Sequence, residues 1–135
     1  HLGTFCGNPL SARSAIAAMS ILDQSAYEKL DNHGRELKEM LDEIIKAYNL
    51  PAYVVQAGAK GCLVWVAGDP LRDYRDYRRR FNFDLGYLSW VYLMNRGVFL
   101  APGQDEQWTH SLCHGKKEAR AFAEAIASLA EEISS

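Results

Sequence analysis

The chain has 135 residues, of which 48% are hydrophobic and 24% charged, and a formal net charge of −2. These totals fit one domain with a modest core and give no positive field that would favour nucleic acid. No apolar run is long enough to span a bilayer, and no signal-peptide pattern is present. The three cysteines (Cys6, Cys62 and Cys113) favour reduced thiols and a cytoplasmic protein over a disulfide framework.

Two helices are predicted at the start of the chain. Asn8 is a favoured N-cap and is followed by a proline, so we predict a helix over residues 9–22. Ser25 and Glu28 have the spacing of a capping box, which predicts a second helix over residues 25–48 with one apolar stripe.

The rest of the chain alternates short strands with helices. Runs rich in β-branched and aromatic residues predict a hairpin with a turn over residues 58–61. The predicted strands and helices are, in order, strands 53–57 and 62–66, a helix over 85–94, strands 98–101 and 108–114, and a helix over 116–133. The order α-α-β-β-α-β-β-α indicates an α+β fold, an antiparallel sheet covered by helices on one face.

An arginine-rich segment lies at residues 71–80, where five arginines alternate with tyrosines and aspartates. Such a segment can be a nucleic-acid patch, a solvated connection or a salt-bridged contact with another chain. The aspartates dilute the charge and the whole chain is slightly acidic, so we expect no nucleic-acid partner and assign the segment no function.

Two loops carry candidate binding chemistry. Gly3 and Thr4 precede the first helix, where a hydroxyl and the free amides of a helix N-terminus can hold a phosphate. Asp105 and Glu106 precede Trp108, and acidic loop residues beside an indole can line a site for a cation or an amine. An ordinary helix cap and a solvated turn are the alternatives at the two loops.

We predict no catalytic residue and no metal site within the chain. On a strand, His110 and His114 would lie about 13 Å apart, too far for two bonds of about 2 Å to one zinc ion. A nucleophilic Cys113 beside His114 is disfavoured because neighbours on a strand point to opposite faces. A serine-hydrolase elbow is absent from the sequence.

Two motifs resemble those of a known enzyme family. Residues 3–10 read GTFCGNPL, which resembles the GTxxGNPL signature of the class III aminotransferases, the pyridoxal-phosphate (PLP) enzymes of fold type I. Residues 96–106, with Ser111, Leu112 and His114, look like the RGVYLAPSQFE stretch and its continuation in glutamate-1-semialdehyde aminomutase. The resemblance covers essentially the whole chain, in order.

This resemblance implies that the chain is the C-terminal part of such an enzyme. Within a single domain of residues 1–135, residues 1–24 would belong to the interface with a large domain, and residues 25–135 would be the C-terminal small domain. In the family, the threonine of the first motif binds the PLP phosphate of the neighbouring subunit of a homodimer. This role carries over to Thr4, with Gly3 beside it. The family's glutamate near the substrate entrance corresponds to Glu106, with Trp108 close by.

Other features depart from the family pattern. The family's Schiff-base lysine lies upstream of the first motif and outside this sequence, so we predict that the chain alone is inactive and needs a large domain in the same or another chain. In the ornithine and GABA branches of the family, an arginine near the position of Gln107 holds a substrate carboxylate. Glutamine cannot form the same bidentate pair, which favours an aminomutase-like enzyme acting on a small amine or amino acid. The alternative is a non-catalytic α+β binding or regulatory module derived from the same scaffold.

Overall fold

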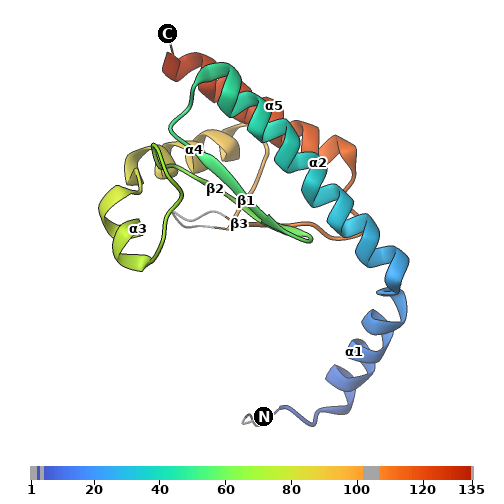
Figure 1. Cartoon of the computed structure of the whole chain (residues 1–135). Coiled ribbons are helices and arrows are strands. Elements are labelled where there is room, and N and C mark those ends of the chain that lie inside the picture. The colour runs from blue at the N-terminus through green and yellow to red at the C-terminus, as the bar shows by residue number, and fades with distance from the viewer. Residues whose placement is uncertain (1–2, 4, 102–106, 135) are drawn as a thin grey trace.

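The structure, a computed structural model, describes Gly3, residues 5–101 and residues 107–134. Within these residues the chain forms five helices and a three-stranded antiparallel sheet of order β1-β2-β3, which confirms the α+β class (Figure 1). The elements are α1 (Pro9–Ile21), α2 (Gln24–Tyr48), β1 (Tyr53–Ala57), β2 (Lys60–Val64), α3 (Tyr74–Arg80), α4 (Phe83–Asn95), β3 (Gln107–Thr109) and α5 (Lys116–Ser134). No helix in the described part of the chain combines the length and apolar character needed to cross a membrane.

The core lies between the sheet and two long helices. α2 packs against both β1 and α5, and Figure 1 shows α2 and α5 side by side. Their apolar stripes recur at helical spacing, so each helix turns one face inward and leaves its charged face to solvent. The largest fully buried apolar side chains come from these helices, α4 and the end of the hairpin: Leu37, Leu41, Trp65, Leu93, Ile126 and Leu129.

The hairpin turn is tighter than the sequence pattern predicts. β1 and β2 are joined by two residues, because Gly58 adopts a φ of 58° that glycine tolerates without strain. Lys60 therefore enters β2 instead of standing in the turn, and it remains exposed. Across the next pair of strands, Gly61 is the register partner of Trp108. A Cβ atom on Gly61 would lie 2.1 Å from the Cζ2 atom of that indole, so the ring covers the glycine directly.

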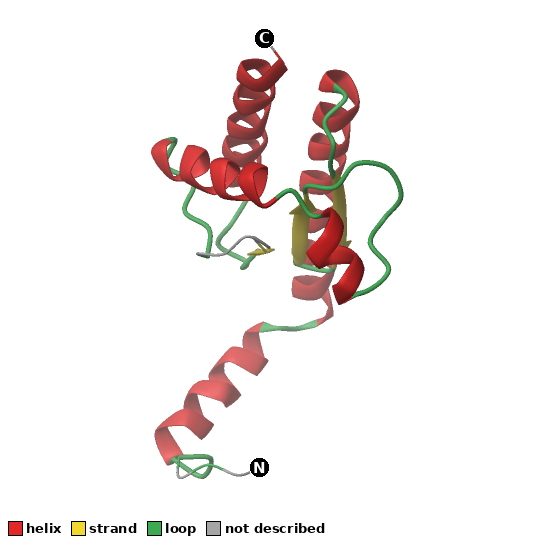
Figure 2. Cartoon of the chain, turned by 90° about the vertical axis from the view of Figure 1, so that its left-hand side faces the viewer, coloured by secondary structure: helices red, strands yellow, loops and turns green. Residues whose placement is uncertain are grey.

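Helix α1 stands apart from the rest of the molecule. None of its 13 residues, all of which the structure describes, is buried. Leu10, Ile16 and Met19 are between 60% and 76% exposed, although the sequence of α1 is largely apolar. In Figures 1 and 2, α1 extends away from the body formed by the other elements. A helix that is apolar over much of its surface is usually covered, so α1 has the character of an interface.

The predicted N-cap of the second helix, Ser25, is wrong by two residues, because the cap is Asp23. α2 begins at Gln24, and the carboxylate of its N-cap, Asp23, accepts a hydrogen bond of 2.8 Å from the amide of Ala26. Ser25 instead donates its hydroxyl to Asp23. An ionised carboxylate is a stronger acceptor at a helix N-terminus than a hydroxyl, which explains why Asp23 takes the capping position.

Two strand predictions are also corrected. Residues 98–101 are not a strand; the carbonyl of Leu100 instead accepts a bond of 3.3 Å from the indole of Trp90. The strand predicted over residues 108–114 ends at Thr109, because the chain turns back at Ser111. The amide of Ser111 donates to Nδ1 of His114 at 3.0 Å, a local bond that competes with strand pairing.

Candidate functional site

The loop before α1 contains two backbone hydrogen bonds. The amide of Cys6 donates to the carbonyl of Gly3 at 3.1 Å, and the amide of Asn8 donates to the carbonyl of Phe5 at 3.1 Å. A Cβ atom on Gly3 would lie 3.0 Å from Sγ of Cys6, which makes alanine tight at this position. Thr4, the predicted phosphate ligand, lies outside the described residues.

The amides at the start of α1 are not free, in contrast to the prediction. Oδ1 of Asn8 accepts from the amides of Leu10, at 2.8 Å, and Ser11, at 3.4 Å. An anion at this end of the helix would therefore meet the positive end of the helix dipole but not these two N–H groups. The first turn of α1 contains no acidic residue that would repel an anion.

A second candidate site is a pocket of about 450 Å³ between residues 97–101, β3 and the first half of α5. Trp108 lines this pocket, although its side chain is only 3% exposed. The ring meets Phe122 of α5 edge to face, with 5.6 Å between ring centroids. Trp108 is therefore both a core residue and a pocket wall. Glu106 and Asp105 lie outside the described residues.

Buried nitrogen atoms at this pocket lack hydrogen bonds. Nε1 of Trp108 and Nδ1 of His110 have no partner among the described residues. An unpaired buried polar atom costs free energy. Both residues line the pocket, but these two nitrogen atoms are themselves buried from solvent.

The histidines after β3 lie much closer than predicted. The rings of His110 and His114 stack with 5.9 Å between centroids, instead of about 13 Å on a strand, because the turn at Ser111 brings His114 back. His33 of α2 meets His110 at 6.3 Å. Burial, with smaller contributions from His114 and His33, lowers the pKa of His110. Among the described residues, no group of histidine, cysteine and acidic side chains is arranged to hold a metal ion.

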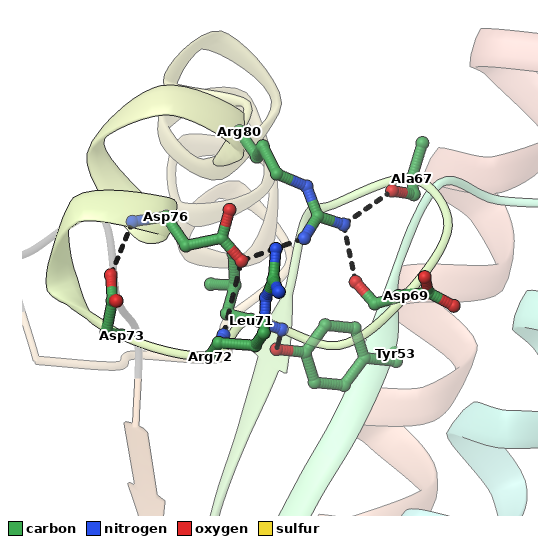
Figure 3. Close-up of polar contacts among 8 residues, drawn as sticks. All are labelled: Tyr53, Ala67, Asp69, Leu71, Arg72, Asp73, Asp76 and Arg80. Atoms are coloured by element: carbon green, nitrogen blue, oxygen red, sulfur yellow. Dashed lines mark hydrogen bonds and ion pairs between the residues drawn. The ribbon is translucent and has the colours of Figure 1, made fainter.

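The arginine-rich segment forms α3, a helix that the sequence pattern did not predict. Its last residue, Arg80, donates to Oδ2 of Asp76 at 2.9 Å and to the carbonyl of Ala67 at 3.0 Å (Figure 3). The same guanidinium also donates to the carbonyl of Asp69. One side chain therefore fastens the loop of residues 67–73 to the helix that follows it.

A second bond fastens this loop to the sheet. The hydroxyl of Tyr53 in β1 accepts from the amide of Leu71 at 3.0 Å (Figure 3). Arg78 lies over the ring of Phe83 at 5.7 Å, which also directs its charge back toward the chain. These contacts give two of the arginines structural roles, and the segment still has no assigned function.

The hydrogen bond between Arg80 and Asp76 should depend on pH. Burial alone would raise the pKa of Asp76, but hydrogen bonds from the amide of Arg72 and from Arg80 hold this pKa below its ordinary value of 3.8. A lowered pKa in the folded state stabilises the fold above pH 3.8, and this contribution is lost as the pH falls through the lowered value. We expect the side-chain ¹⁵N resonance of Arg80 to shift below pH 3.8. If the plot of the Arg80 side-chain ¹⁵N shift against pH is the same for Asp76→Asn and for the unmodified chain, the prediction is wrong.

One residue of the pocket was missed by the sequence reasoning. Glu118 lines it and accepts a bond of 2.8 Å from the amide of Gly115 through Oε2. This bond, the largest of several causes, lowers the pKa of Glu118. The three-residue spacing of Gly115 and Glu118 is that of a helix cap, so the sequence contained a signal for the bond but not for the pocket.

Comparisons with known proteins agree on one kind of relative. None of the known family models matches the chain. The chain is 24% identical over 126 residues to a glutamate-1-semialdehyde 2,1-aminomutase from Clostridium kluyveri, a match that covers 92% of this chain and 30% of that protein.

Solved structures of transaminases share the fold. An omega-transaminase from Sphaerobacter thermophilus matches 97% of this chain and 30% of its own, with a TM-score of 0.80 and 21% identity. A glutamate-1-semialdehyde aminomutase from Pseudomonas aeruginosa, also solved in complex with PMP, matches 83% of this chain and 24% of its own, with a TM-score of 0.74 and 18% identity. The predicted resemblance is thus confirmed: the chain is similar in sequence to a part of an aminomutase, and in fold to a part of a transaminase and of an aminomutase, and it spans between 24% and 30% of their length.

Proposed function

We propose that the chain is the C-terminal part of a PLP-dependent aminotransferase or aminomutase that works as a homodimer. The observation that carries the proposal is the position of α1. A match over 97% of the chain leaves too few residues unmatched to omit this 13-residue helix, so the transaminase fold contains α1 as well as the compact body. The apolar surface that α1 exposes here is the surface that a large domain would cover.

The N-terminal loop suits a phosphate contributed by a partner subunit. Gly3 lies in a turn where a side chain would be crowded, and the first turn of α1 carries no acidic residue. In the proposed enzyme, Thr4 donates its hydroxyl to the phosphate of PLP, and the helix dipole favours the negative charge. PLP, when bound, supplies the electron sink for moving an amino group, and the large domain supplies the lysine that holds it.

The second loop contributes to the substrate mouth. Glu106 and Trp108 are the residues proposed there, for a small amine or amino acid. The buried indole of Trp108 fixes the residue at the end of this loop against α5. An anchored Trp108 gives the proposed substrate mouth one wall of fixed position.

The cofactor role of Thr4 can be tested in the complete gene product. Thr4→Ala is expected to weaken PLP binding by roughly tenfold or more, because a hydrogen bond to a charged group is lost. Thr4→Ser keeps a hydroxyl and is expected to keep most of the affinity. The measurement is a titration of each apoenzyme with PLP, followed by absorbance.

Two results would contradict the proposal. One is equal PLP affinity for Thr4→Ala and the unmodified enzyme. The other is transamination by the 135-residue chain alone with added PLP and an amino donor, since in the proposed enzyme the large domain supplies the Schiff-base lysine. A gene product without a large domain, and without a partner chain that supplies one, would favour the non-catalytic module.

A further inference from the structure

Three histidines lie together where the end of β3 meets α2 and the hairpin turn. The ring of His110 stands edge-on to that of His33 in α2, with 6.3 Å between centroids, and stacks on that of His114 at 5.9 Å. The amide of His110 also donates to the carbonyl of Ala59 in the hairpin turn at 2.9 Å. His110 therefore joins the chain that follows β3 to both α2 and the hairpin.

The surroundings of the His110 ring favour its uncharged form. Its Nδ1 atom is buried and has no hydrogen-bond partner among the described residues. In an uncharged ring the other nitrogen, Nε2, can carry the single proton, whereas a charged ring carries a proton on both nitrogen atoms. Charging His110 in place would therefore bury an N–H donor that has no acceptor, which costs free energy.

No acidic side chain among the described residues offsets a charge on His110. Burial is the largest cause of its lowered pKa, and His114 and His33 lower the pKa further. On the hairpin, Lys60 is cationic and exposed. On α5, Glu118 interacts with His114 and does not contribute to the pKa of His110. The groups around the ring thus oppose its charging together.

The direction of the pKa shift makes this junction sensitive to acid. When the chain after β3 leaves the body, the His110 ring enters water, and its pKa returns toward the ordinary value of 6.5. Between the lowered pKa and pH 6.5, the open form binds more protons than the closed form. The closed form is therefore most favoured above pH 6.5, and it loses stability as the pH falls through this interval.

We propose that His110 is an acid-sensitive latch: its uncharged ring holds residues 110–115, which join β3 to α5, against α2 and the hairpin, and protonation of the ring releases them. His110 and His114 form part of the wall of the pocket of about 450 Å³, so release opens this wall. Trp108 is held separately by its edge-to-face contact with Phe122, which keeps the release local. The latch goes beyond the proposed function and does not depend on it.

The test follows hydrogen exchange of single amides in the ¹⁵N-labelled 135-residue chain, from about pH 7.5 to about pH 5.5. This range includes the ordinary pKa of histidine and leaves carboxylates ionised. The intrinsic exchange rate at each pH, divided by the measured rate, gives a protection factor. We expect the protection of the His110 amide to fall by roughly threefold or more. The amide of Asn82, which donates to the carbonyl of Trp65 at 2.8 Å, is expected to change by less than about twofold.

His110→Phe keeps an aromatic ring that cannot take up a proton, so protection of the amide at residue 110 is expected to become independent of pH. The matched control, His114→Asn, removes an exposed histidine but keeps an acceptor for the amide of Ser111, and it is expected to retain the pH dependence. An equal fall at Asn82 would indicate global unfolding. That result, an unchanged pH dependence in His110→Phe, or its loss in His114→Asn would overturn the proposal.

A second measurement needs no variant. In the unmodified chain, the Hε1 resonance of His110 reports the pH at which its ring takes up a proton. The loss of amide protection is expected over the same pH range. A His110 ring that becomes charged while its amide stays fully protected would also overturn the proposal.

Discussion

Replacing Gly34 by alanine is expected to destabilise the chain by about 2 kcal/mol or more, although the same change inside an exposed helix normally stabilises by about 1 kcal/mol. Gly34 is buried in α2 where this helix crosses the hairpin turn. A Cβ atom there would lie 2.1 Å from the carbonyl oxygen of Gly58 and 2.9 Å from Nε2 of Gln56.

The clash at Gly34 is severe because backbone cannot move aside as a side chain can. The carbonyl of Gly58 is also held by a bond of 2.7 Å from Gln56, so both neighbours are fixed to each other. The matched control is Gly7→Ala, where nothing described lies within 4 Å, and its effect is expected within about 0.5 kcal/mol. The free energies of unfolding come from urea denaturation. A Gly34→Ala variant as stable as the unmodified chain would contradict the close approach of α2 to the turn.

Ile126→Ala is expected to cost about 2–5 kcal/mol of stability, whereas Ile16→Ala is expected to cost less than about 0.5 kcal/mol. Ile126 of α5 is 0% exposed and belongs to the core that α2 and α5 share. Removing its side chain loses apolar burial and leaves a cavity. Ile16 of α1 is 60% exposed, so the same chemical change removes no core contact.

The pair of isoleucine variants tests whether the chain consists of a packed body and an exposed helix, α1. Both are measured by thermal or urea unfolding of the isolated chain. Comparable losses at the two positions would show that α1 is covered in solution, which contradicts its exposed placement. A small loss at Ile126 would show that α5 is not part of the core.

The long helices could be predicted from the sequence because their stability depends on local signals. α1 begins after the Asn8 cap as expected, and α2 ends at Tyr48, where Asn49 adopts a φ of 50°. α5 differs from its prediction by one residue at its end. The helical period of 3.6 residues and the capping residues can be recognised from residues that are close in sequence. These helices can therefore be predicted without knowledge of the fold.

Elements that depend on distant contacts could not be predicted in this way. α3 has no apolar stripe, and its ends are set by the Asp73 cap and by the reach of Arg80 to residues 67–69. The strand after the second loop was overextended because apolar and polar residues continue to alternate past Thr109. There the Ser111 bond to His114 replaces pairing, a competition that alternation does not reveal.

The candidate site was predicted in its residue types more than in its geometry. Trp108 was expected at the start of a strand after the second loop, but its burial depends on Gly61, its partner across the sheet, which leaves room for the indole. The pocket also needs Glu118 from α5 and Phe99 from before the loop, which the chain brings together only on folding. The role of Thr4 remains a prediction based on resemblance.

The separation of α1 from the body has a consequence for how such proteins can be recombined. α1 and α2 are joined by Leu22 and Asp23 alone, and Asp23 already serves as the cap of the second helix. The residues of α1 are not constrained by the interior, so selection can fit them to a neighbouring module without altering the rest. The Leu22–Asp23 junction is therefore a suitable crossover point for chimeric enzymes, in which one donor supplies the contact helix and another supplies the folding unit.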